Sequence, residues 1–449
     1  IDNLRGGGYK NVYSTRGIIA RVNYSYADKY FGNVSYRRDA SSRFHPDKRW
    51  GNFWSASAGW LLNKEAFLQD ITWINLLKLK ASFGQQGNDN ICNYYAWLDQ
   101  YRVTGADGVF ADGVLAYKGN PDITWETSTS YNVGFDYSLL GNKLNGSIEY
   151  FSRKSVDMLY NKPTAGSLGY TSIPMNIGSM TNSGLEIDVN WNVIKTRNID
   201  WSIFANATFI KNTINELHPD LQGKLIDGTR IYEEGESMYR MYLVEYAGVN
   251  AENGLAEFFA TDSVGKRVRT DDYSVAENDK IATKDLLPKV YGGFGTSINA
   301  YGIDVSVQFA YQLGGQIYDS GYARLMHGGT SSYAGNNWHQ DISKAWTPQN
   351  TNTDVPRLDA NDKYANSTST RFLTSSDYLS FNNFTVGYTI PIKKLTDLNI
   401  SKLRVYFVAD NIGIISSRNG LDPRQSFTSA TTALYTPIRT LSGGISVTF

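Results

Sequence analysis

The sequence predicts an all-β protein, a transmembrane antiparallel β-barrel, on three observations. Apolar and polar residues alternate in many segments, which places them on opposite faces of a strand. These segments reach about ten residues, the length that a tilted strand needs to cross a bilayer, whereas strands of soluble proteins mostly run to about five or six. Aromatic residues make up 14% of the 449 residues, beside 41 glycines, and this composition is typical of outer-membrane barrels.

The alternation is clearest in the segment 130–139. Val133 and Phe135 lie on its apolar face, while Asn132 and Asp136 lie on the opposite face. The same complete division recurs in three more segments: 18–26, 184–193 and 303–313. Nine segments with weaker alternation complete the set: 30–38, 52–62, 76–85, 143–153, 200–210, 290–300, 378–390, 402–411 and 438–449. The sequence therefore predicts about 13 membrane strands.

Short and long connections alternate between these strands. The predicted short turns are 27–29, 140–142, 194–199, 301–302 and 391–401, with a somewhat longer one at 63–75. The predicted long loops are 39–51, 86–127, 154–180, 211–289, 314–377 and 412–437. We expect the loop 211–289 to contain a hairpin of its own, formed by 241–248 and 255–260. This asymmetry is typical of barrels with short periplasmic turns and long extracellular loops.

Aromatic residues gather where strands meet the short turns. Tyr24, Tyr26 and Tyr30 surround the turn 27–29, and Tyr301 stands at another short turn. Amphipathic rings prefer the headgroup level of a bilayer, so these residues fit an interfacial girdle. A soluble β-sandwich or propeller would also show alternation, but the strand length and the girdle favour a membrane barrel.

An odd number of strands has a consequence for closure. An antiparallel sheet of 13 strands cannot close on itself, because the first and last strands run in the same direction and would pair in parallel. Unpaired edges are costly in lipid. We therefore expect residues 1–449 to form part of a larger barrel, completed by strands of a preceding segment or of a separate chain.

Composition excludes several classes of function. The 43 basic and 43 acidic residues balance, which argues against a nucleic-acid-binding protein. No stretch of about 20 apolar residues is present, so transmembrane helices are not predicted. The sequence lacks a G-x-S-x-G elbow, a P-loop and an H-E-x-x-H motif. We predict no catalytic residues and no enzyme activity, and the single cysteine, Cys92, cannot form an internal disulfide.

Neither a cofactor nor a metal site is predicted. Four histidines fall in predicted loops: His45, His218, His327 and His339. His327 and His339 lie close enough in sequence to approach one metal ion, but the loop between them carries no further ligand pattern. Asp359 and Asn361 are like the opening of a calcium loop, but Lys363 and the lack of the turn glycine break that pattern.

Short motifs follow one another along the whole chain in a specific order. They are RVNYSY at 21–26, YRRD at 36–39, SSRF at 41–44, WGNF at 50–53, SAGW at 57–60, LKLKASFG at 77–84, NPD at 120–122, YLS at 378–380, GYTIP at 387–391 and GLDP at 420–423. In this order the sequence resembles the C-terminal barrel region of the SusC/RagA family of TonB-dependent outer-membrane transporters. The resemblance implies a barrel of about 22 strands, with the plug domain and the first strands N-terminal to this region.

The resemblance also implies a function and partners. A SusC/RagA protein would be an active importer of nutrient oligosaccharides or peptides in the bacterial outer membrane, energised through TonB and assisted by a SusD-like surface lipoprotein. Nothing in residues 1–449 matches the family's plug or TonB-contacting segment, so energy coupling is implied by kinship alone. A passive porin-like or structural barrel component is the alternative.

Two groups of residues are candidate functional residues, one predicted to face the lumen and one predicted to contact a ligand on the long loops. Polar residues on the face opposite to the apolar one would line a wet lumen: Arg21, Asp136, Glu149, Glu186, Asp188 and Asp304. Large aromatic residues on long loops would stack on sugar rings or peptide side chains: Tyr94, Tyr95, Trp97, Trp338 and Trp346. For the aromatic group the alternative is that the rings anchor long loops to each other.

Overall fold

Thirteen strands form one antiparallel sheet, as predicted. The computed structural model describes residues 10–91, 93–103, 113–333, 335–391, 400–426, 430–431 and 435–449, so Cys92 lies outside the described residues. The strands are β1 (Thr15–Tyr26), β2 (Tyr30–Ser41), β3 (Trp50–Leu61), β4 (Ile74–Asn88), β7 (Glu126–Leu139), β8 (Leu144–Val156), β11 (Ser179–Lys195), β12 (Ile199–Glu216), β20 (Val290–Ala300), β21 (Ile303–Leu313), β24 (Tyr378–Ile390), β25 (Lys402–Ser416) and β26 (Thr440–Thr448).

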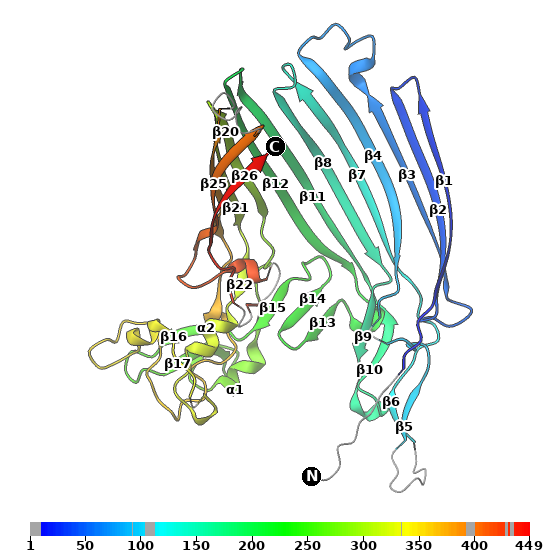
Figure 1. Cartoon of the computed structure of the whole chain (residues 1–449). Helices are drawn as coiled ribbons and strands as arrows, with labels where there is room; N and C mark the ends of the chain where they lie inside the picture. Colours follow the sequence, from blue (N-terminus) through cyan, green and yellow to red (C-terminus); the bar gives the residue numbers. More distant parts are fainter. Residues whose placement is uncertain are drawn as a thin grey trace, which may run out of the picture. The chain divides into compact units, whose positions relative to one another are not determined.

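Each of these strands neighbours the next one in chain order. The order is β1-β2-β3-β4-β7-β8-β11-β12-β20-β21-β24-β25-β26, with β1 and β26 at its two ends (Figure 1). The elements that the order omits belong to long connections. Among the described residues, no helix is long and apolar enough to cross a membrane.

The chain divides into two compact units. The first comprises Ile1–Glu186, Asn212–Gly223 and Glu234–Glu236, and the second comprises Ile187–Lys211, Lys224–Glu233 and Ser237–Phe449. The first unit thus holds β1 to β8 with their loops. The second holds β20 to β26 with the loops that connect them.

Many apolar side chains on the sheet strands are exposed instead of packed in a core. In the first unit Val22 on β1 is 68% exposed and Val133 on β7 is 53% exposed. In the second unit Ile303 and Val405 are also exposed. No protein layer covers this face of either unit in the described structure, so its apolar surface needs another apolar environment. A bilayer supplies one.

The turn after β1 shows how the predicted aromatic girdle is built. Ala27 and Asp28 have positive φ angles of 52° and 49°, the conformation of a tight turn whose twist matches a hairpin. Beside the turn, the Tyr30 ring stacks on the Trp60 ring with centroids 6.1 Å apart. Glu65 accepts hydrogen bonds from the Tyr30 hydroxyl at 2.8 Å and from Trp60 Nε1 at 3.1 Å. The two rings thus pack together while their polar groups are hydrogen-bonded, as a position at the membrane interface requires.

The hydrophobic cores lie in the long loops. One core in the first unit surrounds Phe44 and Trp125. The second unit has two, one around Leu243 and Phe372 and another around Val244, to which Phe258 also belongs. Because these loops pack around hydrophobic cores of their own, each has a defined conformation.

Several short strands and helices belong to these loops. In the first unit they include β5 (Gln100–Val103), β6 (Gly113–Tyr117), β9 (Leu159–Pro163) and β10 (Ser172–Asn176). In the second unit they include β13 (Lys224–Asp227), β14 (Arg230–Glu233), β15 (Arg240–Leu243), β16 (Tyr246–Val249), β17 (Ala256–Thr261), β18 (Arg267–Thr270), α1 (Tyr273–Ala276), β19 (Ile281–Ala282), β22 (Gln316–Tyr318), α2 (Ser320–Leu325) and β23 (Leu373–Ser375).

The hairpin predicted within 211–289 is present but begins later than predicted. β16 pairs with β17, and β17 pairs with β18. The predicted strand 241–248 is divided, because its first half forms β15 and pairs with β14 and β19 instead. Leu243 and Val244 are both fully buried, but in different cores. Adjacent residues of a strand point to opposite faces, so each of the two can enter its own core. The strand ends because the pairing changes, since Leu243 pairs with Ile281 of β19 whereas Val244 pairs with Ser369.

Candidate functional site

The polar face of the first unit carries a cluster of charges. Lys80 Nζ on β4 lies 2.9 Å from Asp136 Oδ1 on β7 and 2.8 Å from Glu149 Oε2 on β8. Gly134 is the direct strand partner of both Lys80 and Glu149. An added Cβ on Gly134 would lie 2.3 Å from the Ile148 carbonyl oxygen and 3.0 Å from the Glu149 Cβ, so glycine allows the close approach of β7 and β8 beside the cluster. Two of the predicted lumen residues, Asp136 and Glu149, therefore share one cation.

A hollow of ≈ 530 Å³ lies over the same polar face. Lys80 and Glu149 line it, together with Lys78 and Asn132. These residues come from β4, β7 and β8, at the positions that alternate with the apolar ones. The cluster is thus open to a polar solvent or ligand.

The polar face of the second unit carries a charged pair. Arg404 on β25 donates to Asp304 on β21, with Nε 2.9 Å from Oδ1. The pair spans the intervening strand β24 at Gly387, where an added Cβ would lie 2.6 Å from Arg404 Nη2 and 2.7 Å from Asp304 Oδ1. Sequence reasoning missed Arg404, although its alternation with Val405 and Phe407 places it on the polar face.

The three other predicted lumen residues are exposed on their strands. Arg21 lies on β1, opposite Ser35 of β2. Glu186 and Asp188 lie on β11, at positions that alternate with partly buried apolar residues. Their position on the wall of a wet lumen stays a prediction.

Tyr94 and Tyr95 hold the loop after β4 to the segment before β1. The Arg43 guanidinium lies 4.7 Å from the centre of the Tyr13 ring and 5.0 Å from that of Tyr94. The Tyr95 hydroxyl accepts a hydrogen bond from the Val12 backbone N–H at 3.0 Å. Both tyrosines thus have an anchoring contact, which is the alternative that the sequence left open.

Two of the predicted tryptophans also anchor loops. Trp97 packs against the core of the first unit and meets the His45 ring edge to face, with centroids 5.2 Å apart. Trp346 Nε1 donates to the Ala251 carbonyl at 3.1 Å, and an added Cβ on Gly254 would lie 2.5 Å from the Trp346 ring.

Trp338 keeps more of its surface open. Its side chain is 47% exposed, while its Nε1 donates to the His327 carbonyl at 2.9 Å. The Trp338 ring also stacks on the His327 ring, with centroids 5.1 Å apart. Of the five aromatic candidates, Trp338 presents the largest exposed fraction.

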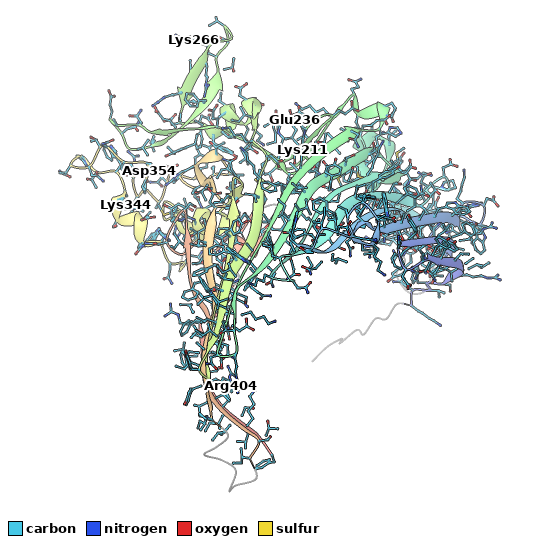
Figure 2. The ribbon with its side chains drawn as sticks, turned by 90° about the horizontal axis from the view of Figure 1, so that it is seen from above. Lys211, Glu236, Lys266, Lys344, Asp354 and Arg404 are labelled. Atoms are coloured by element: carbon cyan, nitrogen blue, oxygen red, sulfur yellow. The ribbon has the colours of Figure 1, made fainter. Side chains whose placement is uncertain are left out.

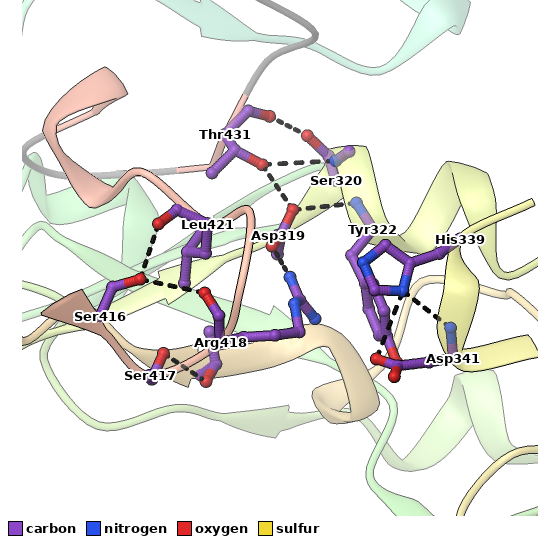
Figure 3. Close-up of polar contacts among 12 residues, drawn as sticks. Asp319, Ser320, Tyr322, His339, Asp341, Ser416, Ser417, Arg418, Leu421 and Thr431 are labelled. Carbon is purple, nitrogen blue, oxygen red and sulfur yellow. Dashed lines mark hydrogen bonds and ion pairs between the residues drawn. The ribbon is translucent and has the colours of Figure 1, made fainter. Parts of the chain in front are cut away.

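A pocket of ≈ 560 Å³ lies between the two last long loops of the second unit. Sequence reasoning missed its polar residues, which Figure 3 shows. Asp319 forms an ion pair with Arg418 and accepts from the Thr431 hydroxyl at 3.0 Å. The Arg418 guanidinium lies 3.5 Å from the centre of the Tyr322 ring. Burial lowers the pKa of Arg418 to about 10, so the group stays charged at neutral pH.

Tyr322 continues this network towards the next segment. Its hydroxyl donates to Asp341 Oδ2 at 3.2 Å, and burial is the first cause that raises the pKa of Tyr322 to about 12. Lys344 donates to Asp341 at 2.7 Å, and this hydrogen bond is the first cause that lowers the pKa of Asp341. His339 Nδ1 lies 3.3 Å from the same carboxylate. Both loops are thus tied together by charges around one tyrosine.

The histidines do not form a metal site. The buried His327 ring lies between Tyr333 and Trp338, whereas His339 accepts from the Asp341 backbone N–H. Asp359 accepts from the Asn361 backbone N–H and forms an ion pair with Arg357 at 2.7 Å, so the segment forms a turn whose carboxylate already has partners. Across the residues that the structure describes, no group of three or more acidic, histidine or cysteine side chains is placed to hold a metal ion.

Comparison with known proteins decides the family. The family described as "TonB dependent receptor-like, beta-barrel" matches residues 3–412. The chain belongs to this family. Its barrel members lie in the outer membrane, so the exposed apolar face of the TonB-dependent receptor chain faces lipid. The family comprises receptors and transporters.

The relatives place the chain in the SusC/RagA group. It is 30% identical over 457 residues to TonB-dependent receptor P3 of Formosa agariphila, covering 95% of this chain and 44% of that protein. It is 27% identical over 434 residues to TonB-dependent receptor SusC of Bacteroides thetaiotaomicron, covering 92% of this chain and 42% of SusC. The chain spans about half the length of these relatives.

A solved structure supports the same group. The structure of the RagAB peptide transporter superposes with a TM-score of 0.84 at 25% sequence identity, covering 97% of this chain and 48% of that one. The predicted resemblance to SusC and RagA is thereby confirmed for the barrel region of this TonB-dependent receptor.

Proposed function

We propose that the protein is an active outer-membrane importer of nutrient oligosaccharides or peptides, energised through TonB and assisted by a SusD-like surface lipoprotein. Residues 1–449 supply the C-terminal part of its barrel, and the plug and the first strands precede them. The observation that carries the proposal is the division of the strands into an exposed apolar face and a charged polar face. A pore wall through lipid has this division.

The long loops support a substrate of some size. They fold around three cores of their own and carry a pocket of ≈ 560 Å³ with charged and amide side chains in the second unit. Such a pocket accommodates several sugar or amino-acid units. The RagAB transporter is titled a peptide transporter, so peptides stand beside oligosaccharides as candidates for this protein.

Uptake by living cells tests this proposal. Deletion of the gene should abolish growth on one oligosaccharide or peptide mixture while growth on its monomers continues, because monomers do not need an active importer. Dissipation of the proton-motive force should stop uptake by wild-type cells. A surface lipoprotein should co-purify with the full-length protein. Uptake that persists without the proton-motive force, with open-pore conductance in planar bilayers, would instead indicate a passive porin.

A further inference from the structure

The pocket between the two last long loops of the second unit has walls that are fixed before any ligand binds. At the start of α2, Thr431 N–H donates to the Tyr318 carbonyl at 2.9 Å, and Ser320 donates to the Thr431 carbonyl. At its end, His339 N–H donates to the Leu325 carbonyl at 3.0 Å. Both ends of the helix are thus tied to neighbouring segments, which lowers the entropic cost of binding.

The charges of the pocket do not cancel. Two carboxylates line it, and each has its own arginine, because Asp319 pairs with Arg418 and Asp422 pairs with Arg424 at 2.7 Å. A further arginine, Arg324, also lines the pocket and is exposed. Within the described part of the chain, Arg324 has no ion pair and no hydrogen bond from its side chain. One guanidinium therefore remains to balance an anionic group of a ligand.

The position of Arg324 on α2 explains why its guanidinium is available. Ala323 and Met326 are buried in the core beneath the helix, so Arg324 lies on the side that the core does not cover. The helix has only six residues, Ser320–Leu325. Its anchoring at both ends therefore fixes the backbone that carries Arg324.

Uncharged polar side chains make up much of the remaining lining, beside the apolar Leu325 and Leu421. Three asparagines contribute amide groups to the pocket: Asn336, Asn337 and Asn419. Each amide offers both donors and an acceptor, which suits hydroxyl groups or peptide groups. A guanidinium beside such amides binds a carboxylate through two parallel hydrogen bonds while the amides bind the neutral part of the ligand.

We propose that this pocket binds the carboxylate of an acidic oligomer through Arg324, with the asparagines holding the adjacent neutral units. The inference rests on the proposed function, because it names the substrate class of the importer. The carboxylate has two possible sources, a uronic acid at the end of an oligosaccharide or the C-terminus of a peptide. The chemistry of recognition is the same for both.

Titration calorimetry on the full-length protein in detergent tests the proposal with four probes. They are a tetrasaccharide that ends in glucuronic acid, its carboxyl-reduced counterpart, a tetrapeptide of alanine, and its C-terminal amide. At least one acid should bind about tenfold more tightly than its neutral counterpart, because a charged hydrogen-bonded pair is lost in the latter. The acid that shows the preference identifies the source of the carboxylate.

Two variants and a matched control assign the preference to Arg324. Arg324→Gln should abolish the preference for the acid, whereas Arg324→Lys should keep part of it. Arg102→Gln removes another exposed arginine, on β5 of the first unit, and should bind like wild type. Surface substitutions of this kind rarely disturb folding.

Two results would overturn the inference. Equal binding of acid and neutral probes, or no binding of either acid, would show that the pocket does not select a carboxylate. A preference that survives in Arg324→Gln would place recognition elsewhere. If the protein shows either result but still takes up its nutrient by the proton-motive force, only this inference is contradicted. The proposed function then stands.

Discussion

A single glycine fixes the charged pair on the polar face of the second unit. Gly387 lies between Asp304 and Arg404, whose side chains meet across its strand. A larger residue would occupy the space in which the two charges meet. At 28% and 25% exposure of their side chains, these two charges are largely shielded from water.

Gly387→Val should therefore lower the free energy of unfolding by about 1–3 kcal/mol, since its side chain forces the ion pair apart. Gly413→Val is the matched control, because nothing lies within 4 Å of an added Cβ at that position of β25. Urea unfolding of the full-length protein in detergent measures both. Equal stability of the two variants would show that the space at Gly387 carries no such constraint.

Asp341 gives the loops of the second unit a pH dependence. Its folded-state pKa is lowered, chiefly by Lys344, so its contribution to stability is complete above the ordinary value of 3.8. The contribution is lost as the pH falls from there through the lower folded-state pKa. Hydrogen exchange of 340–346 should therefore rise over this window.

In Asp341→Asn, the backbone amides of 340–346 should exchange faster than in wild type at pH 6. Their exchange should not rise further between pH 4 and the lower limit of the titration. The variant removes the titrating group but keeps the size of the side chain. A rise as steep as that of wild type would mean that another group controls the docking of this segment.

At the scale of a strand, the side on which a residue lies decides its environment. Val133 on β7 is on the exposed apolar face, and the neighbouring Asn132 lines the polar hollow. Val133→Arg should destabilise the barrel in lipid vesicles by about 2–4 kcal/mol, because a charge near the bilayer midplane is costly. Asn132→Arg should change the stability far less. Urea titration of the full-length protein in vesicles compares them, and equal losses would contradict the assigned faces.

The sequence allowed the sheet strands to be predicted because alternation is a local signal. All 13 strands are present. The bulge in β24 is also visible in the sequence, because Phe381 and Phe384 stand three positions apart, whereas strict alternation would give an even spacing. Phe381 stacks on Phe309, whereas Phe384 pairs with Val307 beyond the bulge. Their spacing marks the extra residue that alternation alone does not place.

The loops could not be predicted in the same way. Leu243 and Val244 are adjacent and equally apolar, and alternation places them on opposite faces, but nothing local shows that a separate core covers each face. Arg324 and Asn419 meet at one pocket although 95 positions separate them. Such contacts depend on tertiary packing, and for this reason the sequence indicated aromatic loop residues but not the pocket.

At the scale of the whole molecule, the two faces of the sheet explain its place in the membrane. Many apolar positions of the strands are exposed, and the polar positions carry paired charges. The cores instead stabilise the loops. This arrangement assigns the membrane span to the strands, and it supports the proposed import with ligand contact at the loops.

Labelling of the full-length protein in vesicles with a photoreactive probe confined to the bilayer core tests this arrangement most directly. Four apolar strand residues should be labelled: Val133, Phe135, Val189 and Val307. Four polar neighbours should be spared: Asn132, Asp136, Asp188 and Asp304. Mass spectrometry of peptides locates the label. Labelling of the polar set, with the apolar set protected, would contradict the assignment of the two faces and the import function built on it.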